Sequence, residues 1–224
     1  MNAGLRLVIF DVDGTLVDSQ GDILAAMRRA FDAVGLSLPP RDEVLGIVGL
    51  SLDVAMARLA PEGDHPTMVQ AYKDAYMYLR AQTGAAESSP LYPGAREALA
   101  RLNARPEVLL GVATGKSKRG LDKLVEAHGL EGVFVTQQVA DFHPSKPHPS
   151  MIHEAMRETG VEASQTVMIG DTSFDMEMAS AAGVVGLGVD WGYHPSTALV
   201  AARTIVSDFP ALDATLDAVW ETGL

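Results

Sequence analysis

The feature of this chain that most limits its fold is a set of short apolar runs with no alternation of polar and apolar residues. These runs cover residues 5–10, 108–113, 132–135, 166–170, 183–189 and 204–206. Such runs are typical of strands that are buried on both faces, as in a parallel sheet. Helical patterns follow most of them, over residues 118–128, 150–159, 174–182 and 211–220. The alternation predicts an α/β fold, with a doubly wound, mostly parallel Rossmann-like sheet and right-handed crossovers.

Residues 18–85 interrupt this alternation and read as a group of helices. Apolar residues recur there at helical spacing, as at Ile23, Met27 and Phe31. The expected helices cover residues 22–34, 41–47, 52–59 and 66–82. We therefore expect a helical cap domain, residues 18–85, inserted into a core domain that is formed by residues 1–17 and 86–224. Asp18 and Ser19 are expected only to mark where the chain leaves the core.

The composition limits the possible partners. The 17 basic and 29 acidic residues give a formal net charge of -12. A chain this acidic repels polyanions, which argues against nucleic acid or an anionic membrane as a partner. An anionic substrate must then be bound by a local cation or by oriented backbone N–H groups. The chain has no cysteine, so disulfides, thiolate metal sites and thiol nucleophiles are excluded. Without a signal peptide or a stretch long enough to span a membrane, we expect a cytoplasmic protein.

The first apolar run ends in two carboxylates, Asp11 and Asp13, followed by Gly14 and Thr15. Ligands of open α/β sheets bind beyond the carboxyl ends of the strands, which is where these residues lie. Two like charges one residue apart cost free energy unless a cation or a pKa shift compensates them. The pattern favours a catalytic or metal-binding pair, although an Asx turn with a helix cap would use the same residue types.

A second strand end carries groups that suit an anion. Thr114 can offer its hydroxyl, and Gly115 and Lys116 can offer backbone N–H groups at a helix N-terminus. A Walker A loop that ends in Gly115, Lys116 and Ser117 does not fit, because Gly111 precedes Gly115 by one residue too few. This strand end is therefore a candidate phosphate site without being a P-loop.

Lys146 and further aspartates complete the candidate site. Lys146 stands between two prolines and is a compact charge that suits a phosphate or carboxylate. Another apolar run ends at Asp171, and Asp175 follows at an expected helix start, where capping is the ordinary explanation. Capping does not explain why separate strand ends deliver aspartates to one crevice. The aspartates are hard oxygen donors of the kind that hold Mg²⁺, and the metal would offset their clustered charge.

Four stretches resemble, in order and spacing, the motifs of the haloacid dehalogenase-like hydrolase superfamily. They are DVDGTLVDS, the strand end at Thr114, Lys146 in KPHP, and GDTSFD. The resemblance covers essentially the whole chain, including a helical cap after the first motif. It implies that Asp11 is the nucleophile that becomes phosphorylated and Asp13 the general acid/base. Dehalogenases of the superfamily lack an Asp at the latter position, so its presence argues for phosphate chemistry.

The same resemblance assigns the other site residues. Thr114 and Lys146 would bind the transferring phosphoryl group. Asp171 would ligate Mg²⁺, and so would the residues that follow the first strand, Asp11 by its carboxylate and Asp13 by its backbone carbonyl. Asp175 would support this metal site from the second layer of contacts.

The layout looks like that of phosphoglycolate phosphatases and their relatives. Residues 46–59 resemble the cap segment that reaches over the active site in that group, so Gly49 and Ser51 are candidate substrate contacts. Gly14 and Gly115 are expected to present backbone N–H groups to the phosphate.

The expected activity is magnesium-dependent hydrolysis of a small phosphomonoester, such as 2-phosphoglycolate or a sugar phosphate, through an aspartyl-phosphate. The main alternative is a sugar phosphomutase that retains the phospho-aspartate. A pyrophosphatase and a non-enzymatic regulatory domain on the same fold are further alternatives. A phosphonate hydrolase would need a cap lysine that forms a Schiff base, and Lys73 has no special context for that role. The expected partner is a small phosphorylated metabolite, and the chain is expected to act as a monomer or homodimer.

Overall fold

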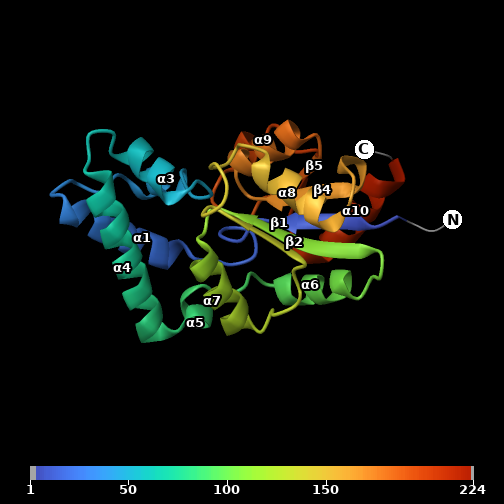
Figure 1. The fold of residues 1–224 in the computed structure, drawn as a ribbon, viewed down its shortest axis with the longest axis horizontal. Helices are drawn as coiled ribbons and strands as arrows, with labels where there is room; N and C mark the ends of the chain where they lie inside the picture. The colour runs from blue at the N-terminus through green and yellow to red at the C-terminus, as the bar shows by residue number, and fades with distance from the viewer. Residues whose placement is uncertain (1–3, 223–224) are drawn as a thin grey trace.

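The computed structural model describes residues 4–222, which form a parallel sheet with helices on both faces (Figure 1). Six strands pair in the order β3-β2-β1-β4-β5-β6, and every pairing is parallel. The strands are β1 (Arg6–Phe10), β2 (Val108–Thr114), β3 (Thr136–Val139), β4 (Thr166–Gly170), β5 (Val185–Val189) and β6 (Thr204–Val206). The predicted fold class is confirmed. The strand order reverses beside β1, the place where open sheets of this type bind ligands.

Two hydrophobic cores hold the helices against the sheet. Along β1, successive side chains point to opposite faces. Val8 and Phe10 enter the core that is shared with α6, α7 and α10, whereas Leu7 and Ile9 enter the core that is shared with α8 and α9. These helices are α6 (Ala95–Asn103), α7 (Lys118–His128), α8 (Ser150–Thr159), α9 (Ser173–Ala182) and α10 (Phe209–Thr222). The central strands are therefore buried on both faces, which is why they lack polar residues.

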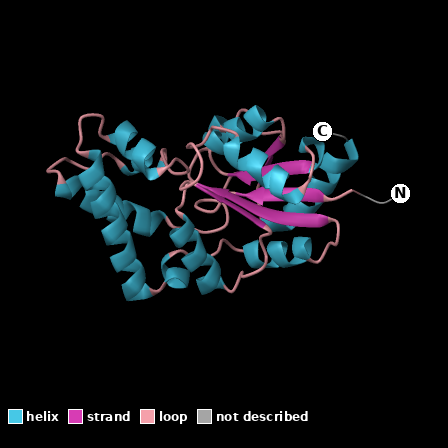
Figure 2. Ribbon diagram, in the orientation of Figure 1, coloured by secondary structure: helices cyan, strands magenta, loops and turns pink. Residues whose placement is uncertain are grey.

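A separate group of helices lies beyond the carboxyl edge of the sheet, on the side toward which the strand arrows point (Figure 2). It comprises α1 (Gln20–Ala33), α2 (Arg41–Leu45), α3 (Leu52–Leu59) and α4 (His65–Thr83). These helices share a core of their own, in which Met27, Phe31, Val44, Met56 and Met68 are buried. The expected cap helices are thus present, each within two residues of its predicted bounds. The exact domain boundaries stay a prediction.

The strand predicted at residues 132–135 is wrong, because the structure places the strand at Thr136–Val139. Phe134 is buried in the core before the strand begins, which explains the apolar run. The strand itself lies at the edge of the sheet and carries polar side chains: Oγ1 of Thr136 donates to Glu158 at 2.6 Å, and Nε2 of Gln138 donates to Thr136 at 2.7 Å. Because its side chains are polar, a search for apolar runs does not detect this strand.

Two helices have no counterpart in the sequence predictions. The short helix α5 (Ala85–Ser88) connects the cap to the core and contacts both α4 and α7. In α6, the buried residues Ala95, Ala98, Leu99 and Leu102 follow helical spacing, so a periodicity search over this segment could have found it. Among the described residues, the structure contains no helix that is long and apolar enough to cross a membrane.

Candidate active site

The carboxyl ends of three neighbouring strands bring the predicted residues together. Asp11 and Asp13 follow β1, Thr114 ends β2, and Asp171 follows β4. Because β1 pairs in parallel with both β2 and β4, these ends meet at one edge of the sheet. The expected crevice therefore collects groups from distant parts of the sequence.

Asp11, Asp171 and Asp175 form a group of buried carboxylates at this edge. One oxygen atom from each lies within 4.8 Å of the others. Asp175 reaches the group from the first turn of α9, where it also forms a capping box with Thr172. Capping and participation in the site are therefore two roles of the same side chain.

Lys146 is the buried cation beside this group. Its Nζ lies 2.9 Å from Oδ1 of Asp11 and 2.7 Å from Oδ1 of Asp175. Burial alone would lower the pKa of Lys146, but the two neighbouring carboxylates raise that pKa above its ordinary value. The ammonium group therefore stays charged, and a single positive charge faces the carboxylates.

The pKa values of two of these carboxylates are raised, because burial and neighbouring negative charges disfavour their charged forms. Burial raises the pKa of Asp11 to about 7, although Lys146 opposes the rise. Burial, followed by the charges of Asp175 and Asp11, raises the pKa of Asp171 well above its usual range. A cation bound at this group would relieve the repulsion among these side chains.

The donor set fits a divalent metal ion. Asp11 lies 2.9 Å from Nζ of Lys146, and no other described residue donates a hydrogen bond to its carboxylate oxygens. Asp171 is held in place by Thr15, whose Oγ1 donates to Oδ1 at 2.8 Å, and by the backbone N–H of Tyr193, which donates to Oδ2 at 2.8 Å. The group offers carboxylate oxygens alone, which suits Mg²⁺.

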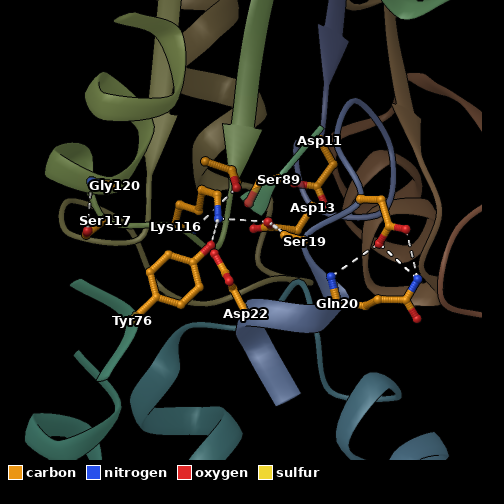
Figure 3. A network of polar contacts seen from close by, with 12 residues as sticks. Asp11, Asp13, Ser19, Gln20, Asp22, Tyr76, Ser89, Lys116, Ser117 and Gly120 are labelled. Carbon is orange, nitrogen blue, oxygen red and sulfur yellow. Dashed lines mark hydrogen bonds and ion pairs between the residues drawn. The ribbon is translucent and has the colours of Figure 1, made fainter. Parts of the chain in front are cut away.

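The structure places the fourth aspartate differently from the other three. The carboxylate of Asp13 is not part of the buried group, whereas that of Asp175 is. Asp13 instead points into the polar network in Figure 3, where its Oδ1 lies 2.7 Å from Nζ of Lys116 and accepts a hydrogen bond from Oγ of Ser19. This arrangement is consistent with the expectation that Asp13 reaches a metal through its backbone carbonyl and uses its carboxylate elsewhere.

Ser19 and the side chain of Lys116 are site residues that the sequence analysis missed. The expectation that Ser19 only marks the exit from the core is wrong, because its hydroxyl contacts Asp13 and its N–H donates to the hydroxyl of Tyr193 at 2.9 Å. A serine before a helix is an ordinary N-cap, so nothing local pointed to this role. Burial would lower the pKa of Lys116, but Asp13 and Tyr76 raise it above its ordinary value.

Two predicted glycines are required by close packing. Gly14 has a φ of +83°, and a Cβ atom there would lie 2.2 Å from Oδ2 of Asp171. A Cβ atom at Gly115 would lie 2.6 Å from the backbone oxygen of Leu50 and 2.7 Å from that of Gly49. The first glycine lets the chain turn against the carboxylate group, and the second lets the cap loop lie directly on the end of β2.

A cavity of about 860 Å³ lies between the cap and the core. Its lining includes the predicted residues Asp11, Asp13, Gly49, Ser51, Thr114 and Gly115. The cap loop is tied to the core because the N–H of Ser51 donates to Oγ of Ser145 at 2.9 Å. The exposed Lys73 lines the same cavity from α4, outside the buried carboxylate group. The candidate nucleophile, the candidate acid/base and the candidate cap contacts therefore line one cavity.

Comparison with known proteins agrees with this site. A family model described as "Haloacid dehalogenase-like hydrolase" matches residues 8–189. The chain is 36% identical over 208 residues to a Dickeya dadantii protein named "Probable phosphatase IndB", covering 91% of this chain and 90% of that protein. It is 31% identical over 211 residues to a phosphoglycolate phosphatase from Pseudomonas fluorescens, covering 92% and 75%.

A solved structure supports the fold. The beta-phosphoglucomutase from Clostridium difficile superposes with a TM-score of 0.83 and 18% identity, covering 97% of this chain and 98% of that one. At this identity the likeness concerns the fold alone. The family match and the named relatives assign the chain to a known group: the chain belongs to the haloacid dehalogenase-like hydrolase family and is a phosphatase of that family.

Proposed function

We propose that this phosphatase hydrolyses a small phosphomonoester in a magnesium-dependent reaction that passes through an aspartyl-phosphate on Asp11. The observation that carries the proposal is the environment of Asp11. Asp11 lines the cavity, and its buried carboxylate lies 2.9 Å from Nζ of Lys146 with no other hydrogen-bond donor among the described residues. A carboxylate in that position can attack a phosphorus atom, while the buried ammonium group offsets charge on the phosphoryl oxygens.

The remaining residues would act in the two steps of the reaction, which are formation of the aspartyl-phosphate and its hydrolysis. Thr114 and the N–H of Gly115 would bind phosphoryl oxygens. The expectation that Gly14 does so is wrong, because its N–H donates to the backbone oxygen of Val17 at 2.9 Å. Asp13 would protonate the leaving oxygen and then take a proton from the water that attacks the phosphorus atom. Asp11 and Asp171 would hold Mg²⁺ with their carboxylates and Asp13 with its backbone carbonyl, while Asp175, bound to Lys146 and Thr172, would support them. The metal would supply charge neutralisation for the transferring group. The cap would exclude bulk water from the cavity.

Phosphate release from a panel of phosphomonoesters tests this proposal, with 2-phosphoglycolate first because one relative carries that name. We expect release that requires Mg²⁺ and stops in Asp11→Asn, while the thermal unfolding midpoint of the variant stays close to that of the wild type. Interconversion of a hexose phosphate without net phosphate release would instead indicate the phosphomutase alternative. Turnover by Asp11→Asn would contradict the assignment of the nucleophile.

A further inference from the structure

Lys116 occupies an unusual position at the joint between the core and the cap. It follows β2 in the core, and its side chain is 9% exposed. From the cap, Tyr76 on α4 covers it: the hydroxyl accepts a hydrogen bond from Nζ at 3.2 Å, and Nζ lies 5.2 Å from the ring centroid. Figure 3 shows the ammonium group between this tyrosine and Asp13. Lys116 also lines the cavity.

Tyr76 is itself held firmly against the core. Arg80, one turn further along α4, places its guanidinium 4.8 Å from the tyrosine ring. That guanidinium donates to the backbone oxygen of Gly120 at 3.4 Å and to Oγ of Ser89 at 3.2 Å. The tyrosine therefore fixes the direction of the Lys116 ammonium group toward the reaction centre.

The position of Lys116 beside Asp13 determines which part of a substrate its ammonium group can contact. In the proposed reaction Asp13 makes a hydrogen bond of about 2.8 Å to the leaving oxygen. Nζ of Lys116 lies 2.7 Å from Oδ1 of Asp13. The ammonium group is thus close to the leaving oxygen and to atoms bonded nearby, while Lys146 lies on the other side, against Asp11. In a chain with a net charge of -12, such a local cation is needed to hold a further negative group of a substrate.

We propose that Lys116, positioned by Tyr76, determines substrate specificity by binding an anionic group that the leaving part of the substrate carries close to the ester oxygen. A carboxylate separated from that oxygen by one carbon, or a second phosphate bonded to it, both meet this description. The inference rests on the proposed phosphatase function and names the substrate class of that site. It predicts a preference for anionic over neutral leaving groups of similar size.

The test compares kcat/KM for three substrates: 2-phosphoglycolate, pyrophosphate and the neutral ester ethyl phosphate. The wild type should prefer at least one anionic substrate over ethyl phosphate. In Lys116→Met, the ratio of anionic to neutral kcat/KM should fall by about 100-fold, because a charged hydrogen bond to the substrate is lost. Lys116→Arg should recover part of the ratio, and Tyr76→Phe should lower it to a smaller extent. If the ratio falls for 2-phosphoglycolate, the bound group is a carboxylate. If it falls for pyrophosphate, the bound group is a phosphate.

Lys118→Met is the matched control, since Lys118 pairs with Asp122 on α7 and does not line the cavity. The ratio of anionic to neutral kcat/KM in Lys118→Met should equal that of the wild type. An unchanged ratio in Lys116→Met would overturn the inference, because a lysine that only supports Asp13 would affect all three substrates equally. A wild type that prefers ethyl phosphate would also overturn it, even if Lys116→Met failed to fold. A wild type that hydrolyses none of the substrates or the wider panel would contradict the proposed function instead.

Discussion

At Lys146, one ammonium group holds together two carboxylates that would otherwise repel each other. The side chains of Lys146, Asp11 and Asp175 are 0%, 1% and 0% exposed, so solvent does not screen these charges. A buried ion pair of this kind contributes little net stability when it is complete, but removing one partner leaves an uncompensated charge. We therefore expect the lysine to stabilise the fold in addition to its proposed role in phosphate binding.

Lys146→Met should lower the free energy of unfolding by about 3 kcal/mol, because the carboxylates lose their cation. Chemical denaturation in the absence of divalent metal measures this change. Arg157→Met is a suitable control, since Arg157 pairs with Glu154 at the surface and its removal should have little effect. Equal stability of Lys146→Met and the wild type would show that the carboxylates do not depend on this charge.

The sequence was sufficient to identify most of the residues at this scale but not their mutual contacts. Asp11, Asp13, Thr114, Lys146 and Asp171 stand at strand ends or in motifs that the sequence displays. Lys116, which follows β2, and Ser19, which precedes α1, both contact Asp13 in the folded chain. No local sequence pattern distinguishes a lysine or serine that makes such a contact, so these contacts can be identified only from the structure.

At the scale of elements, several contacts join cap and core, and two of them can be tested separately from the reacting groups. One is the cap loop on Gly115, and the other is His194, which bridges the two parts. The N–H of Ser173 donates to Nδ1 of His194 at 3.2 Å, so the ring must carry its proton on Nε2, which donates to the backbone oxygen of Gly46 at 3.1 Å. The neutral ring satisfies both contacts, and a protonated ring would lose the one at Nδ1.

Gly115→Ala should displace the cap loop, because the added methyl group would lie 2.6 Å from a backbone oxygen that cannot rotate away. We expect kcat/KM to fall by about 10-fold or more, with little change in the thermal unfolding midpoint of the core. Gly21→Ala in α1 is the control: nothing lies within 4 Å of its Cβ position, so activity should be retained. Full activity of Gly115→Ala would show that the loop contact is unimportant.

The cap–core contact at His194 should weaken in acid. Burial lowers the pKa of His194 below its ordinary value of 6.5. The unfolded chain therefore binds more protons than the folded chain below pH 6.5, and the stability from the neutral ring, complete above that pH, is lost as the pH falls. The thermal midpoint of the wild type should drop more between pH 7 and pH 5 than that of His194→Phe. His153 is exposed on α8, so the control variant His153→Phe should show the same pH dependence of the thermal midpoint as the wild type. Identical profiles for the wild type and His194→Phe would contradict the interpretation.

Prediction from sequence worked for strands that are buried on both faces and for helices that are buried on one face. Strands buried on both faces and the amphipathic cap helices follow directly from hydrophobic pattern, and both were found. The edge strand β3 was misplaced because Thr136 and Gln138 obtain their partners from α8 and from each other, which a search for apolar runs cannot detect.

At the scale of the whole molecule, we propose that this acidic chain binds its substrate inside the cavity and not on its surface. The net charge of -12 disfavours the approach of a phosphomonoester, and Lys116 in the cavity lining, with Lys146 buried beside Asp11, would offset it locally. Lys146 neutralises the carboxylates on the core side, and Lys116 faces the cap. This separation of two buried cations, one for the phosphoryl group and one for the leaving group, is the arrangement from which the proposed activity and its specificity both follow.

The most direct test of this account is chemical trapping of the phosphoryl group on Asp11. The protein is mixed with an accepted phosphomonoester and Mg²⁺, quenched, reduced with borohydride and analysed by peptide mass spectrometry. We predict that reduction converts Asp11 to homoserine, and that this happens only when both substrate and Mg²⁺ are present. Steady hydrolysis with Asp11 unmodified, or reduction at another residue, would contradict the central claim.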